Sequence, residues 1–104
     1  MALPKRYQQL AEQHPEIVTA YEALGAAVHG AGPLDARSRA LVKLGISAGA
    51  RLEGALHSHV RKALAAGCTP AEIRHALLLA MPTLGLPATM AALSWADDIL
   101  ESPA

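Results

Sequence analysis

Three side chains that can transfer protons lie within seven residues of one another: Glu53, His57 and His59. They fall in residues 52–67, where apolar residues recur at helical spacing. Histidine can act as a general acid or base near neutral pH, and a carboxylate beside an apolar face needs a partner or a functional reason. We therefore predict that chemistry takes place where this segment meets its neighbours, with His59, Glu53 and His57 as the candidate catalytic residues.

Helix geometry divides these three residues between two edges of one apolar stripe. Glu53 and His57 are one turn apart, so their side chains can touch. His59 lies about 200° around the helix from His57 and flanks the opposite edge. Structural interpretations stay open as well. Glu53 can be an acid that the helix dipole favours at the N-terminus and that pairs with His57, with Arg61 or with another subunit. His59 would then be bonded to a backbone carbonyl, and His57 would be solvated or ion-paired.

The same residues raise the question of a metal site. Glutamate and histidine at i, i+4 spacing can chelate a divalent ion, but His59 points away from the pair that Glu53 and His57 form. We therefore predict no metal and no cofactor. The single cysteine, Cys68, excludes an internal disulfide, and we expect it to be a small apolar residue.

Composition predicts a helical protein that associates with itself. The 104 residues are 52% apolar but only 3% aromatic, without phenylalanine, so the core must consist of closely packed Leu, Ala, Ile, Val and Met. So much apolar surface on a short chain favours burial between subunits. The formal net charge is zero, which argues against nucleic acid and anionic membranes as partners. The first residues have no apolar signal core, so we expect a cytoplasmic protein.

Capping and proline signals predict the helices that position the site. Residues 1–104 are expected to form one all-α domain of about six helices, because strand-like alternation is absent. Tyr21 and Trp95 are expected core anchors, and the segment holding Leu77, Leu78 and Leu79 is expected to be the most buried helix. The predicted helices span residues 4–13, 15–28, 36–50, 52–67, 70–81 and 87–100.

The apolar stretch from Ala76 to Trp95 is long enough to cross a membrane. However, Pro82, Gly85 and Pro87 interrupt it, and neither flank has a positive cluster. We predict two short helices joined by a proline-bounded turn, buried in a subunit interface, rather than a membrane span.

One segment of the chain resembles the carboxymuconolactone decarboxylase family, which also contains the alkyl hydroperoxidase D-like proteins. The resemblance rests on a central helix carrying His59, an eight-residue step to Gly67, and a Thr-x-x-Glu cap at Thr69 before an apolar helix. It covers roughly residues 34–95. It implies an all-helical protomer that forms homotrimers or homohexamers, with the active pocket near subunit contacts.

The chain departs from the peroxidase branch of that family. The resemblance places the two cysteines of that branch on Leu52 and Ala55, and its glutamate on Ala40; only the histidine, His59, is kept. Thiol peroxidase chemistry needs a low-pKa thiolate and a resolving partner, which leucine and alanine cannot supply. The decarboxylase branch works without cysteines.

The leading hypothesis is therefore a small-molecule enzyme of decarboxylase or lactone type that uses His/Glu proton transfer without a cofactor. Arg37 or Arg39 would bind an anionic substrate, although both can equally be structural ion-pair donors. The alternative is a non-catalytic helical scaffold or binding module that keeps the fold. A redox protein of the peroxiredoxin type, using Cys68 alone, is the weakest of the three.

Overall fold

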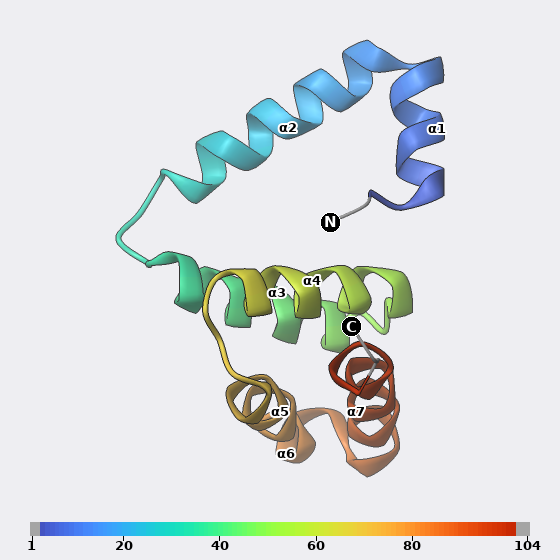
Figure 1. The fold of residues 1–104 in the computed structure, drawn as a ribbon. Helices are drawn as coiled ribbons and strands as arrows, with labels where there is room; N and C mark the ends of the chain where they lie inside the picture. The colour runs from blue at the N-terminus through green and yellow to red at the C-terminus, as the bar shows by residue number, and fades with distance from the viewer. Residues whose placement is uncertain (1–2, 102–104) are drawn as a thin grey trace. The chain divides into compact units, whose positions relative to one another are not determined.

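A computed structural model describes residues 3–101, and every regular element in this range is an α-helix. The described chain divides into two compact units, one ending at Pro33 and the other beginning at Leu34. The six long predicted helices are all present, and a one-turn helix, α6, is added between the last two (Figure 1). The helices are α1 (Lys5–Gln13), α2 (Pro15–His29), α3 (Ala36–Gly49), α4 (Glu53–Ala65), α5 (Pro70–Leu78), α6 (Met81–Leu84) and α7 (Leu86–Leu100).

The first unit is a pair of helices, α1 and α2. Pro15 occupies the start of α2, where its missing N–H costs nothing, and Glu16 follows in the first turn, where the helix dipole favours an acid. The Tyr7 hydroxyl donates to Glu22 Oε1 at 3.1 Å and joins the two helices. The expectation that Tyr21 anchors a core is wrong within the protomer. Tyr21 is 64% exposed. The other large apolar residues of the same α2 face are also exposed, at 55–61%: Ile17, Leu24 and Val28.

The second unit begins with α3 and α4, which pack against each other. Asp35 caps α3, because its side chain accepts a hydrogen bond from the Ser38 N–H at 2.8 Å. The turn between the helices places Arg51 in the left-handed region, with φ of 57°, and the Leu52 N–H bonds back to the Ser47 carbonyl at 3.1 Å. This short connection sets α4 antiparallel to α3, as Figure 1 shows.

The last three helices follow the sharpest local signal in the sequence. The Thr69 side chain accepts from the Glu72 N–H, and the Glu72 side chain accepts from the Thr69 N–H, which completes the predicted capping box. Gly67 and Gly85, with φ of 94° and 90°, make the turns that precede α5 and α7. The prolines after position 81 start new helices instead of lengthening α5.

One core lies between α3, α4, α5 and α7. Leu44, Leu56, Val60, Ile73 and Leu77 are fully buried in it, and Trp95 packs against it from the rim, as expected.

The expectation that α5 is the most buried helix is wrong. Leu78 and Leu79 are 44% and 66% exposed, because α5 turns only one face to α3 and α7. As for the apolar stretch, no helix within residues 3–101 is long and apolar enough to cross a membrane.

Candidate functional site

The central helix α4 packs against α3 on one side and α7 on another, so its two histidines meet different neighbours. The structure keeps the separation that the helix geometry predicts. His59 lies near lysine side chains on the α3-facing side, and His57 contacts α7.

His59 is half-buried on the α3-facing side of α4. Burial lowers the pKa of its imidazole, and the charges of Lys62 and Lys43 lower it further. Lys62 is less than one turn away on α4, whereas Lys43 belongs to α3. A neutral imidazole is therefore favoured beside two ammonium groups.

Lys43 extends this positively charged surface along α3. Burial lowers the pKa of its ammonium group, and the like charges of Lys62 and Arg39 add to the effect. We call Arg39, Lys43, His59 and Lys62 the basic cluster. An anion bound here would relieve the repulsion among its charges and place a reacting atom near the imidazole.

Glu53 and His57 lie on the other side of α4, with Asp98 of α7. His57 Nε2 and Asp98 Oδ2 are 3.0 Å apart, and the side chains are 22% and 58% exposed. A carboxylate oxygen of Glu53 completes the group, and all three ligand atoms lie within 4.8 Å of one another. We call these residues the α4–α7 cluster. The structure thus brings Glu53 together with His57 but not with His59.

Sequence reasoning did not identify Asp98. The residue contacts His57 across 41 positions, so no local spacing connects the two. The available signal was the pair of acids, Asp97 and Asp98, on an otherwise apolar final helix. Asp97 bonds Arg74 at 3.1 Å, which leaves Asp98 facing α4.

The two arginines predicted to bind substrate have different contacts. Arg37 forms an ion pair with Glu72 and so supports the start of α5, which is the structural interpretation that the sequence left open. Arg39 donates a hydrogen bond to the Leu34 carbonyl, and its charge lowers the pKa of Lys43. Arg39 is therefore the better placed of the two for an anionic ligand.

The positions of the peroxidase cysteines lie at the start of α4. Leu52 is exposed and Ala55 is half-buried, and neither offers a thiol. Cys68 is buried, as expected for a small apolar residue, with its Sγ atom 3.9 Å from the Arg37 carbonyl oxygen.

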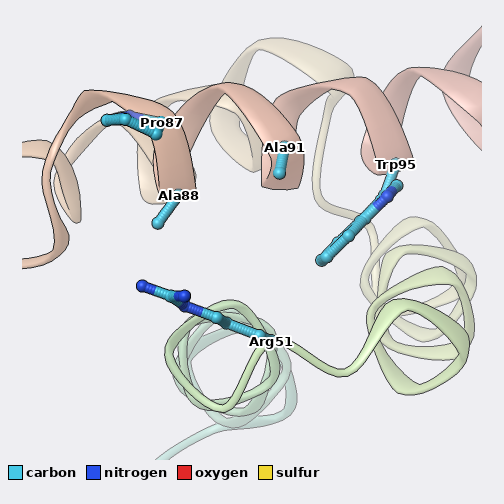
Figure 2. A pocket seen from close by; sticks show the side chains of 5 residues that line it. All are labelled: Arg51, Pro87, Ala88, Ala91 and Trp95. Carbon is cyan, nitrogen blue, oxygen red and sulfur yellow. The ribbon is translucent and has the colours of Figure 1, made fainter.

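Two hollows lie on the second unit. The smaller, of about 190 Å³, is lined by Arg51 and by the α7 residues Pro87, Ala88, Ala91 and Trp95. Figure 2 shows the Arg51 side chain extending below Ala88, with Ala91 and Trp95 pointing into the same space.

The larger hollow, of about 380 Å³, lies between α3 and α5 and includes Glu72 and His75 in its lining. Neither hollow is lined by His59 or Glu53. The expected hollow holding both residues is not one of these two, because the residues face opposite sides of α4.

The second unit is an all-α unit whose central helix carries His59 and is followed by a capping box, which are the features on which the resemblance to a known family rests. The carboxymuconolactone decarboxylase family model matches residues 15–98, and this chain belongs to that family. The match begins earlier than the predicted region and includes α2.

A relative in Haemophilus influenzae (strain ATCC 51907 / DSM 11121 / KW20 / Rd), described as an uncharacterized protein, is 36% identical over 59 residues. The alignment covers 57% of this chain and 52% of that protein, so the chain matches about half the length of its relative. No solved structure matches the chain.

Proposed function

We propose that this protein is an enzyme that moves a proton on a small organic anion, with His59 as the general acid or base. The observation that carries the proposal is the position of His59, half-buried on α4 beside Lys43 of α3 and Lys62. The chain belongs to the carboxymuconolactone decarboxylase family, and the resemblance described above implies that His59 takes the place of a histidine of that family.

The chemistry needs only the groups of the basic cluster. A ring nitrogen of His59 removes a proton from the carbon next to a carbonyl, and the electron pair moves to the carbonyl oxygen as an enolate. The ammonium groups of Lys43 and Lys62 stabilise that negative charge, and Arg39 holds a carboxylate of the substrate. Return of the proton to the same or a neighbouring carbon completes a reaction of lactone type. In a reaction of decarboxylase type the bond to the carboxylate breaks instead of the C–H bond: carbon dioxide leaves, the electron pair forms the same enolate, and His59 donates a proton to the carbon. Glu53 and His57 take no part in this step.

The proposal includes self-association into a trimer or hexamer. Large apolar residues stay exposed on the described protomer, among them Leu79 and Met90 of the second unit at 66% and 54%. An assembly would cover such surfaces and enclose the basic cluster.

The test is proton exchange on simple probes. The protein is incubated in deuterated buffer with carboxylated γ-lactones and β-keto acids, and NMR measures deuterium uptake and decarboxylation. We expect the His59→Gln variant to lower the rate about 100-fold or more, as for loss of a general acid–base group. His75→Gln, which removes an exposed histidine on α5, is the matched control and should leave the rate unchanged.

Unchanged activity in His59→Gln would contradict the proposal. The second candidate is a non-catalytic helical scaffold, which is favoured by the position of both hollows away from His59. That candidate predicts that the wild-type protein neither turns over the probes nor shifts the His59 imidazole signals when they are added.

A further inference from the structure

The α4–α7 cluster gathers three metal-ligand side chains from two helices. Glu53 and His57 are one turn apart on α4, and Asp98 reaches them from α7. The three ligand atoms lie within 4.8 Å of one another, and the closest pair, His57 Nε2 and Asp98 Oδ2, is 3.0 Å apart. The cluster is independent of the basic cluster, so the inference does not rest on the proposed function.

The donor set suits a divalent cation of the zinc class. One imidazole and two carboxylates are ligands that zinc accepts, usually with water completing a three-residue site. Ligand atoms of a tetrahedral zinc ion lie about 3.4 Å apart, so only a small rotation of the carboxylates is required. Glu53 and Asp98 are exposed, and their side chains can rotate without disturbing the core.

An ion pair alone does not account for the group. An imidazole carries at most one positive charge, and the Asp98 carboxylate is enough to balance it. Glu53 adds a second negative charge at the same point, which costs free energy through repulsion. A doubly positive ion would balance both carboxylates.

The surroundings leave room for ligands that the protein does not supply. Asp98 lies one turn beyond Trp95 on α7, and Ala91, Trp95 and Asp98 follow at i, i+4 and i+7 along one face. Ala91 and Trp95 also line the hollow beside Arg51 (Figure 2), so Asp98 lies on the same face of α7 as that hollow. Because Glu53 and Asp98 are exposed, water can reach the free coordination positions.

We propose that Glu53, His57 and Asp98 bind one zinc-class divalent cation per chain, linking α4 to α7. The sequence predicts no metal, because His59 points away from Glu53 and His57 on the helix. The structure keeps that separation and supplies Asp98 as the third ligand.

The test is calorimetric titration of zinc chloride into the full chain, freed of any affinity tag and of metal. We expect one ion per chain, and we expect the dissociation constant for zinc to rise about tenfold or more in Asp98→Asn and in His57→Ala. Asp97→Asn is the matched control, because it removes the same charge from the adjacent residue, whose side chain bonds Arg74 instead. Its zinc affinity should equal that of the wild type.

NMR spectra with and without zinc locate the ion. The proposal requires changes at the His57 imidazole and at the backbone around Glu53 and Asp98, and wild-type zinc affinity in His59→Gln. Absence of binding, or equal binding by wild type and Asp98→Asn, would overturn it. Circular dichroism of the metal-free variants confirms that each is folded before affinities are compared.

Discussion

The two sides of α4 show how one helix places two histidines in opposite environments. His59 faces α3 among positive charges, where burial favours its neutral form. His57 faces α7 beside two exposed carboxylates, Glu53 and Asp98. The residues are only two apart, yet a rotation of about 200° separates them. Proximity in sequence is thus a poor guide to a shared site on a helix, and each side calls for its own chemistry.

The largest expected effect comes from breaking the core that supports both sides. Leu56 is fully buried on α4, so Leu56→Ala removes packing and leaves a cavity. We expect a loss of about 2–5 kcal/mol in the free energy of unfolding, measured by urea denaturation. Leu64→Ala on the same helix is the control, since Leu64 is 37% exposed and should cost much less. Equal losses would show that α4 is not anchored as described.

An intermediate effect is expected from the pH dependence of the α3-facing side. The folded-state pKa of His59 lies below the 6.5 of an ordinary histidine, so the unfolded chain binds this proton more tightly. The contribution of His59 to the free energy of unfolding is therefore complete above about pH 6.5 and is lost as the pH falls from there through the lower pKa of the folded state. NMR titration of the imidazole, with a chelator present, measures the pKa directly.

Lys43→Met sharpens that measurement. Removing a positive charge that lowers the His59 pKa should raise that pKa, whereas Arg74→Met should leave it unchanged, because Arg74 of the same unit bonds Asp97 and does not act on His59. The same His59 pKa in both variants would contradict the placement of Lys43 in the basic cluster.

The smallest effect is expected on the α7-facing side. A double-mutant cycle with His57→Ala and Asp98→Ala should give a coupling energy of about 0.2–1 kcal/mol without metal, because Asp98 is 58% exposed and solvent screens the pair. Denaturation at low and high salt measures it, and the coupling should decrease with salt. A coupling that is large and insensitive to salt would show that this side is less open than the exposed fractions indicate.

Local signals in the sequence predicted the helices well. The Thr69–Glu72 capping box, the Asp35 cap and the prolines are decided by contacts within a few residues, and the structure places each as expected. The added helix α6 follows from Pro82, which ends one helix and suits the first turn of the next.

Features that depend on distant contacts could not be predicted in this way. The exposure of Leu78 and Leu79 depends on which face of α5 meets other helices, and apolar character alone does not decide that. Likewise, Asp98 joins His57 only because α7 folds back beside α4. The split between His59 and Glu53, in contrast, was predictable from helix geometry, although the expected shared pocket disregarded it.

The left-handed backbone of Arg51 has a consequence for engineering this protein. Glycine would adopt the φ of 57° without a Cβ clash and would be the residue of choice for stability alone. Arginine at this position instead directs a guanidinium over the hollow beside α7. An exchange of Arg51 for glycine would therefore relieve the left-handed backbone and would also remove the only charged side chain among the described residues that line this hollow.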